Sequence, residues 1–419
     1  MIRKLLLAAA STLTLVSPVF AADPYPRVGA VLTGGAQNYW DSTYQGQIAK
    51  LQVVVLTYYP GWGSGHGTTM EKTIQQLKAR NSNIKVFLYQ NIAGRPSPVP
   101  STWPGLNTKL NAQKWWLYQT WGGTSKVASN CGSGYLLNIT PYSTKDSSGL
   151  HYNEWIARYV ATQVGKTNPS AAGIFTDCVS WQARAAGDWN QDGRTDSAGD
   201  ASAAAWMRDG FSRYADELHA QMPGKLQLAN AADWGKPESV VTELQGAFDG
   251  GVLEGMIGRS YSREGLTGGW QLMMAAYRKA MGVMASPKMA VFVQTGSVTD
   301  YQGMRYGLGS ASLGDAYFAY QDVAKTAYSS AVYFDEYGAK LGAATSSWPT
   351  TAWQSGVYRR NFQNGIVLVN PKGNGVRTVT LEKNYRKLKG SQAPTINNGA
   401  TVKTVTLKDR DGIILLNAP

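Results

Sequence analysis

The chain has 419 residues, enough for one large domain with a small second one or for two to three ordinary domains. Its 40 Lys and Arg against 27 Asp and Glu give a net charge of +13. No basic run exceeds a few residues, which argues against a nucleic-acid-binding protein. The charge favours an acidic polysaccharide or an anionic cell surface as the partner.

The first 21 residues have the pattern of a secretory signal peptide. Arg3 and Lys4 supply a positive start, residues 5–20 are mostly apolar, and Val19-Phe20-Ala21 resembles a cleavage site. The apolar run is short for a membrane span, so a retained anchor is the less favoured alternative. We expect a monomer that is secreted or periplasmic in a bacterium, with no stable membrane anchor and no nucleic-acid partner.

Eight apolar runs alternate with helical patterns along most of the chain. Residues 68–80, 154–164, 203–220 and 270–284 have helical spacing. Alternating strands and helices predict a parallel sheet, and eight such units predict a closed (β/α)8 TIM barrel over residues 22–345. The expected strands are residues 27–32, 51–58, 84–90, 173–177, 225–229, 250–254, 289–293 and 316–320.

The pattern changes near residue 345. A segment rich in Ser, Thr, Ala and Pro, residues 343–351, reads as a linker. After it come short alternating runs separated by turn residues, without helical periodicity, which predict a small all-β sandwich over residues 346–419. We expect this domain to pack on the barrel, which is favoured over carbohydrate binding.

Two of the predicted strands end in a carboxylate. Residues 173–177 end in Asp177, and residues 250–254 end in Glu254. In a (β/α)8 barrel the catalytic groups lie at the carboxyl ends of the strands. Two carboxylates that converge there are the usual catalytic groups of a glycoside hydrolase, so we expect Asp177 and Glu254 to be catalytic. The alternative is that both are surface acids at the start of loops.

Other polar or aromatic residues follow predicted strands, or lie beyond the last of them, and are candidates for binding substrate. Asp233 and Glu336 are also reserve acids, and the alternative for each candidate is packing, a turn or a helix cap. No organic cofactor is expected. The candidates are Tyr58, Asn91, Asn230, Asp233, Trp234, Gln294 and Glu336.

Residues 187–200 resemble a calcium-binding loop. Oxygen-bearing side chains stand at alternate positions, and Gly193 stands at the sharp turn. The bidentate Glu of such loops is missing, and Asp200 would have to substitute one position later. A polar turn stabilised by its own side chains is the alternative to a structural Ca²⁺ site. The expected ligands are Asp188, Asn190, Asp192, Arg194 (through its carbonyl), Asp196 and Asp200.

Two further features lie near the expected site. Residues 92–150 are too long for a simple connection and contain Trp115, Trp116 and Trp121, which predict either a lid or groove wall, or helix core packing. Cys131 and Cys178 are the only cysteines. Export permits a disulfide between them, but a pair of buried free thiols is an equal alternative.

The joint pattern of motifs resembles the glycosyl hydrolases called family-15-like, over essentially the whole chain after the signal. That group is similar to endo-α-1,4-polygalactosaminidases and to the hydrolase domain that acts on Pel exopolysaccharide. The resemblance implies a glycan substrate and a functional Asp after strand four and Glu after strand six, which correspond to Asp177 and Glu254. The motifs are GIFTD ending at Asp177, DWNQDG from Asp188, ANAADW ending at Trp234, GGVLEGMIG around Glu254, MRYGL from Met304, FDEYG from Phe334, NGIVLVNP from Asn364 and RDGIILL ending at Leu416.

The expected activity is hydrolysis of a bacterial or environmental polysaccharide or oligosaccharide. Glu254 would protonate the leaving oxygen, and Asp177 would act as nucleophile or as base for water. A polysaccharide lyase and a non-catalytic glycan-binding barrel are the alternatives. A metal-dependent deacetylase is disfavoured because the three histidines show no ligand spacing.

Overall fold

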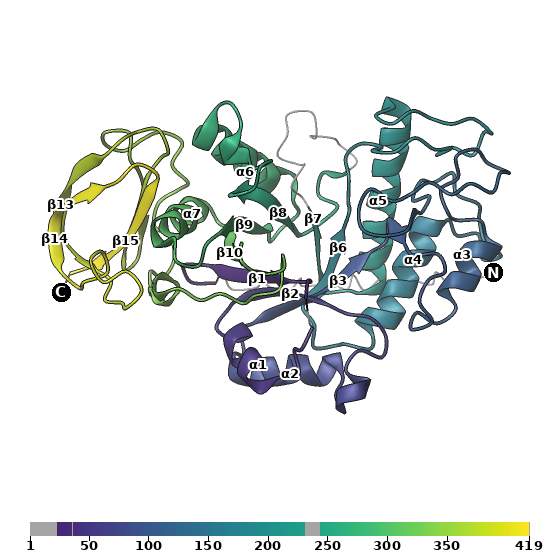
Figure 1. Ribbon diagram of the computed structural model, residues 1–419, viewed down its shortest axis with the longest axis horizontal. Coiled ribbons are helices and arrows are strands. Elements are labelled where there is room, and N and C mark those ends of the chain that lie inside the picture. Colours follow the sequence, from purple (N-terminus) through teal and green to yellow (C-terminus); the bar gives the residue numbers. More distant parts are fainter. Residues whose placement is uncertain (1–22, 36, 231–243, 419) are drawn as a thin grey trace, which may run out of the picture.

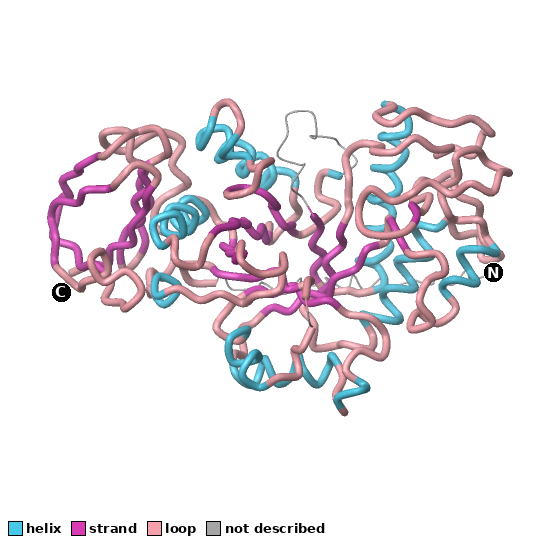
Figure 2. Tube along the Cα trace, viewed as in Figure 1, coloured by secondary structure: helices cyan, strands magenta, loops and turns pink. Residues whose placement is uncertain are grey.

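The chain forms a closed barrel of parallel strands and a separate antiparallel sheet (Figures 1 and 2). The computed structural model describes residues 23–35, 37–230 and 244–418. The predicted signal peptide lies outside the described residues. No helix among the described ranges is both long and apolar enough to cross a membrane.

Eight parallel strands close the barrel in the order β1-β10-β9-β8-β7-β6-β3-β2. The prediction of a (β/α)8 barrel is confirmed, because each expected strand is present with its bounds shifted by a few residues at most. Runs such as Val53–Thr57 are buried on both faces, as parallel strands covered by helices require. The strands are β1 Val28–Leu32, β2 Val53–Thr57, β3 Lys85–Asn91, β6 Gly173–Asp177, β7 Leu226–Asn230, β8 Gly250–Ile257, β9 Met289–Gly296 and β10 Tyr317–Asp322.

Helices connect the strands and cover the outside of the barrel (Figure 1). Side chains cap the first turn of several of them: Asp41, Thr69, Asp200 and Asp300 each accept a hydrogen bond from a backbone amide. The α-helices are α1 Ser42–Ile48, α2 Met70–Arg80, α3 Leu106–Ala112, α4 Tyr152–Val160, α5 Ala201–Gln221, α6 Gly269–Val283 and α7 Tyr301–Leu313; short helical turns are η1 Ser64–His66, η2 Ala161–Gly165, η6 Arg263–Gly265 and η7 Asp335–Gly338.

Successive side chains along each strand point to opposite faces of the sheet and so belong to two different hydrophobic cores. Val55, Phe87, Phe175 and Val252 belong to a core that fills the inside of the barrel. The alternate residues, such as Leu88, belong to a larger core between the strands and the helices. A side chain two positions after the last lumen-facing hydrophobic residue of a strand is on the same side of the sheet, and at the carboxyl end of the strand it lies at the mouth of the barrel.

The long segment after β3 is packed rather than open. Besides α3 it contains the two-residue strands β4 Gly94–Arg95 and β5 Tyr135–Leu136. Trp115 and Trp116 are fully buried, and their indole nitrogens donate to the Thr144 carbonyl at 2.6 Å and to Asn111 Oδ1 at 2.7 Å. These two tryptophans therefore pack in a core, whereas aliphatic residues of the same segment form a wall of the site described below.

The C-terminal strands form one antiparallel sheet of five strands, in the order β11-β12-β15-β13-β14. Ile366, Leu381 and Leu415 are among the residues that form a core on one side of this sheet. Val367 and Val369 face the opposite way and join the barrel core beside α7. The strands are β11 Tyr358–Phe362, β12 Gly365–Asn370, β13 Arg377–Lys387, β14 Thr401–Leu407 and β15 Asp411–Asn417.

Buried polar contacts fix this sheet to the barrel. Arg305 on α7 pairs with Asp411 at 2.9 Å, and both side chains are 6% exposed. Glu336, in η7, accepts a hydrogen bond from Asn397 at 2.8 Å. Burial raises the pKa of the Glu336 carboxyl despite this bond. The acid groups at this interface are therefore occupied by structural partners.

Candidate active site

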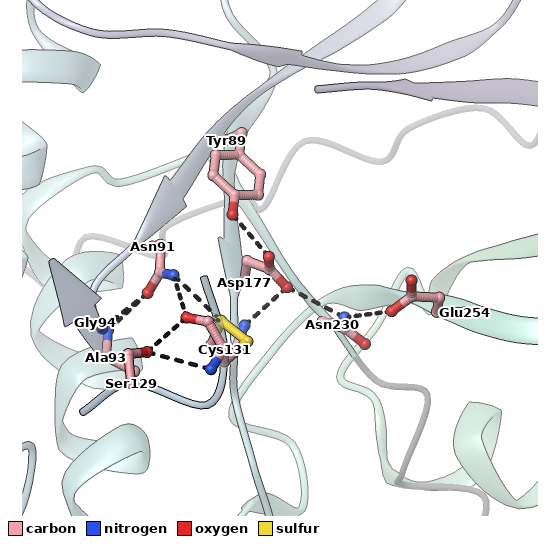
Figure 3. Close-up of a disulfide and its surroundings, with 10 residues drawn as sticks. Tyr89, Asn91, Ala93, Gly94, Ser129, Cys131, Asp177, Asn230 and Glu254 are labelled. Carbon is pink, nitrogen blue, oxygen red and sulfur yellow. Dashed lines mark hydrogen bonds between the residues drawn. A yellow bond between two sulfur atoms is a disulfide. The ribbon is translucent and has the colours of Figure 1, made fainter. Parts of the chain in front are cut away.

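Three neighbouring strands bring Asp177, Asn230 and Glu254 together at the mouth of the barrel. Each follows a lumen-facing residue by two positions, and β6, β7 and β8 are adjacent in the sheet. The Asn230 side-chain amide donates to Asp177 Oδ1 at 3.1 Å and to Glu254 Oε2 at 3.2 Å. Figure 3 shows Asn230 between the two acids. The two carboxylates predicted to be catalytic therefore face one another across a shared amide.

Asp177 is held by donors on both of its oxygens. Oδ1 also accepts from the Cys178 amide at 2.8 Å, and Oδ2 accepts from the Tyr89 hydroxyl at 2.7 Å (Figure 3). Tyr89 points into the lumen two positions after Phe87. These donors fix the orientation of the Asp177 side chain toward the mouth of the barrel.

Glu254 has a different set of neighbours. The Tyr328 hydroxyl donates to Oε1, and Tyr261 lies beside the carboxyl group. Gly255 has a φ of +66°, and a Cβ atom there would approach the Tyr261 ring to 2.4 Å. The glycine therefore lets Tyr261 lie next to Glu254, where its ring is 57% exposed.

The tyrosines at the site stay protonated and act as donors. Burial is the largest cause that raises the pKa of Tyr89, and the negative charge of Asp177 adds to it. Burial likewise raises the pKa of Tyr328, and Glu254 adds to that shift. Both phenols are thus neutral at any physiological pH and orient the carboxylates by hydrogen bonding.

Two cavities meet at the acids. A small one of about 270 Å³ is lined by Tyr89, Asp177, Glu254 and Tyr328, among others. A larger one of about 570 Å³ borders Glu254 but not Asp177. Both are lined by Asn230. Walls of the larger cavity come from the long segment after β3, from the loop after β6 and from α5: Leu136, Leu137, Ile139, Val179, Trp189, Met207 and Phe211 contribute apolar surface.

A disulfide joins the wall of the larger cavity to the strand that carries Asp177. Cys131 and Cys178 are bonded with their Cα atoms 6.0 Å apart, so the alternative of free thiols is not what the structure shows. Cys178 adopts the left-handed region at φ +64°. Asn91 supports the bridge, since its amide donates to the Cys131 carbonyl at 3.2 Å and its oxygen accepts from the Ala93 and Gly94 amides (Figure 3).

The sequence profile of hypothetical glycosyl hydrolase family 15 matches residues 78–366, more than half of the chain. The chain belongs to this family. It is a glycoside hydrolase, with its pair of acids at the mouth of the barrel. At the level of sequence, no curated protein matches the chain significantly.

Solved structures with a similar fold are distant in sequence. Amy13B of Eubacterium rectale is 8% identical, with a TM-score of 0.53 and coverage of 94% of both chains. A family 39 glycoside hydrolase of Bacteroides cellulosilyticus is 10% identical, with a TM-score of 0.50 and coverage of 93% of this chain and 80% of that one. The glycoside hydrolase domain of PelA from Pseudomonas aeruginosa is 13% identical, with a TM-score of 0.41 and coverage of 71% and 95%. The first two likenesses support the barrel fold alone.

Some residues predicted to bind substrate lie away from the acids. The Tyr58 hydroxyl is directed to Thr167, 3.3 Å away, beyond η2. Gln294 is 1% exposed, and its amide donates to the Gly303 carbonyl on α7 at 3.0 Å. Glu336 lies at the interface with the C-terminal sheet. Asn230 is brought to the acids, Asn91 supports the disulfide beside them, and Asp233 and Trp234 lie outside the described residues.

Sequence reasoning missed Tyr89, Tyr261 and Tyr328. Tyr89 could have been found, because it continues the lumen-facing alternation of Phe87 in β3. Tyr328 lies in the loop after β10 and is positioned by long-range contacts: its amide donates to Gln321 Oε1 at 2.8 Å and its carbonyl accepts from Gly34. No local pattern marks such a residue.

The predicted calcium loop has the turn that its sequence suggested. Gln191 and Gly193 have positive φ, and Asp188 accepts hydrogen bonds from the amides of Trp121, Asp192 and Gly193. Asp200 caps α5. Burial, and then the charges of Asp200, Asp188 and Asp192, raise the pKa of Asp196.

The carboxylates of this loop do not form a tight ligand cluster. Among the residues that the structure describes, the one group of three His, Cys, Asp or Glu with ligand atoms within 4.8 Å is Cys131, Asp177 and Cys178, and its cysteines are in the disulfide. The crowding of negative charge around Asp196 suits a cation, but the backbone amides already occupy oxygens of the loop. Calcium binding here stays a prediction.

Proposed function

We propose that the protein is an exported glycoside hydrolase that cleaves a polysaccharide with retention of configuration, using Asp177 as nucleophile and Glu254 as acid and base. The observation that carries the proposal is the Asn230 amide, which bonds to both carboxylates. A glycosidic bond can lie between groups arranged in this way. The apolar sequence of residues 1–21 supports export.

The short distance between the acids favours retention. The two hydrogen bonds of Asn230 place the nearest oxygens no more than about 6.3 Å apart, which is the sum of 3.1 Å and 3.2 Å. Retaining glycosidases have carboxyl groups about 5–5.5 Å apart, whereas inverting enzymes need roughly 6.5–9.5 Å to admit a water molecule. Because 6.3 Å is the upper limit for the nearest oxygens, it supports the closer, retaining arrangement of the two acids.

The environments of the acids support their separate roles. Asp177 accepts three hydrogen bonds, from Tyr89, Cys178 and Asn230, which hold the nucleophile in a fixed orientation. Glu254 borders both cavities. This position suits an acid that protonates the oxygen between two sugars. In this arrangement the sugar that becomes bonded to Asp177 occupies the small cavity. The leaving part of the chain occupies the larger one.

The mechanism follows in two steps. In the first, the Asp177 carboxylate attacks the anomeric carbon while protonated Glu254 gives its proton to the leaving oxygen, and the glycosidic bond breaks. In the second, Glu254 takes a proton from water, which attacks the anomeric carbon and releases Asp177. Tyr261, exposed beside Glu254, offers a ring on which a sugar in the larger cavity can stack.

The test is a screen of bacterial exopolysaccharides and α-1,4-linked amino-sugar polymers for new reducing ends, followed by NMR of the first product formed. We expect reducing ends and an initial product with the anomeric configuration of the substrate. An inverted product would overturn the nucleophilic role of Asp177. A product that absorbs in the ultraviolet would indicate a lyase, and binding without any product would indicate a glycan-binding barrel.

A further inference from the structure

The C-terminal sheet carries a concentration of positive charge that the active site does not use. Between residues 377 and 408 there are seven Lys and Arg and a single acid, Glu382. Arg359 already neutralises this acid through two hydrogen bonds of 2.7 Å, which hold the pKa of Glu382 at about 2. None of the seven forms an ion pair with another residue that the structure describes: Arg377, Lys383, Arg386, Lys387, Lys389, Lys403 and Lys408.

Several of these cations lie on the two strands farthest from the barrel. Figure 1 shows β13 and β14 at the outer end of the molecule. Lys383, Arg386 and Lys403 are exposed around the irregularity where the pairing of β13 with β14 shifts register. We call the outward surface of these strands, with the adjoining Trp353, the β13–β14 face.

Threonines fill the outward positions between the cations. Thr378 pairs with Thr406 and Thr380 with Thr404, and all four are exposed. The hydroxyls of Thr378 and Thr406 lie 2.9 Å apart. Such a surface offers hydrogen-bonding groups and few large apolar side chains, so it fits a hydrated polymer better than a lipid bilayer.

An exposed aromatic ring adjoins the same strands. Trp353 is 39% exposed, and the Arg359 guanidinium that binds Glu382 lies 4.8 Å from the centre of its ring. The neighbouring Gln354 accepts a hydrogen bond from the Thr380 amide at 3.0 Å, which ties this loop to β13. Tryptophan presents a flat apolar surface with one polar edge, a combination suited to a sugar ring.

We propose that the β13–β14 face binds a strand of acidic polysaccharide at a site separate from the active site. Lys383, Arg386 and Lys403 neutralise its carboxylates, the threonine hydroxyls contact its hydroxyl groups, and Trp353 stacks on one of its sugars. The site holds the enzyme on an anionic matrix while the barrel mouth stays available to substrate. It does not depend on which bond the barrel cleaves.

The test measures binding of the full chain to polygalacturonate, with neutral amylose as the comparison, in a Glu254→Gln background that prevents cleavage. We expect binding to polygalacturonate that weakens as NaCl is added, and none to amylose. Combined Lys383→Glu, Arg386→Glu and Lys403→Glu substitutions should raise the Kd about a hundredfold or more at low salt. Trp353→Ala should raise it about tenfold, and Trp353→Phe should restore most of the affinity.

The matched control replaces three exposed lysines of the barrel domain, Lys72, Lys145 and Lys166, with Glu, which gives the same change in net charge. Its Kd should stay close to the parent value. Equal weakening by both triple variants would overturn the proposal, because binding would then follow net charge alone. So would the absence of binding to polygalacturonate, or tighter binding to anionic phospholipid vesicles or to duplex DNA. Thermal unfolding of each variant checks that it is folded.

Discussion

The mouth of the barrel and the interface with the C-terminal sheet both gather acids, but they use them differently. At the mouth, Asp177 and Glu254 share an amide and border cavities. At the interface, Asp411 and Glu336 are buried and bonded to Arg305 and Asn397. An acid near the end of an element is thus a candidate for catalysis only where its structural partners leave it open to a ligand.

Substitutions of the acids at the barrel mouth should have the largest effect, which is on turnover and which substitutions of the interface acids should not share. Asp177→Asn and Glu254→Gln should each lower kcat by at least about 10³-fold, since each removes a group that acts in the transition state. Both side chains are close in size to the originals, so thermal unfolding should change little. The measurement is hydrolysis of the polysaccharide that the screen identifies. Turnover near the wild-type value in either variant would remove that residue from the mechanism.

A substitution at the interface should act on stability instead. Asp411→Ala leaves the guanidinium of Arg305 buried without its carboxylate, at a cost of about 3–5 kcal/mol in the free energy of unfolding. Denaturant unfolding measures the loss, and Asp216→Ala, on the exposed surface of α5, is the control. Loss of activity in the folded Asp411→Ala protein would show that the two regions are coupled.

A third set of acids lies in the loop of residues 188–200. Adding Ca²⁺ would show whether these acids bind a ligand, as at the barrel mouth, or serve only as structural partners, as at the interface. If the loop binds Ca²⁺ in the native state alone, a concentration one hundred times the Kd should stabilise the protein by about 2.7 kcal/mol. Thermal unfolding with Ca²⁺ and with a chelator measures this, and Asp192→Ala should abolish the difference. The same unfolding temperature in both solutions would leave the loop as a turn held by its own hydrogen bonds.

The smallest expected effect is that of Glu336→Gln. Activity should stay within about twofold of the wild type, because the carboxyl group contacts Asn397 and not the site. Burial raises the pKa of Glu336 above its ordinary 4.5, so the folded state favours its protonated form. The wild type loses this contribution to stability as the pH rises through the folded pKa. Denaturant unfolding should show that the free energy of unfolding of the Gln variant increases relative to that of the wild type as the pH rises through this range.

The alternation within strands explains which site residues the sequence could predict. Asp177, Asn230 and Glu254 each follow a lumen-facing residue by two positions, after Phe175, Leu228 and Val252. Gln294 follows the lumen-facing Val293 by one, so it points at α7. Tyr58 likewise has the outward parity relative to Val55. Apolar runs in the sequence are enough to predict the strands. Only the number of positions from a lumen-facing residue shows whether a side chain at the strand end points to the mouth of the barrel or to the surrounding helices.

Residues outside the strands were beyond such reasoning. Tyr328 reaches Glu254 from a loop whose path depends on contacts with Gln321 and Gly34. The disulfide could not be deduced either, because only the fold brings Cys131 within 6.0 Å of Cys178.

The disulfide also has a consequence for how the chain tolerates cleavage. Its loop spans 47 positions and includes β5, α4 and β6. A protease that cut the exposed backbone near Ser147 or Lys166 would leave two polypeptides still covalently joined. The fragment with Asp177 and Cys178 would stay attached to the fragment with Cys131, and residues of both fragments line the larger cavity. The two acids and the cavity wall would in this way stay assembled after the chain was cut.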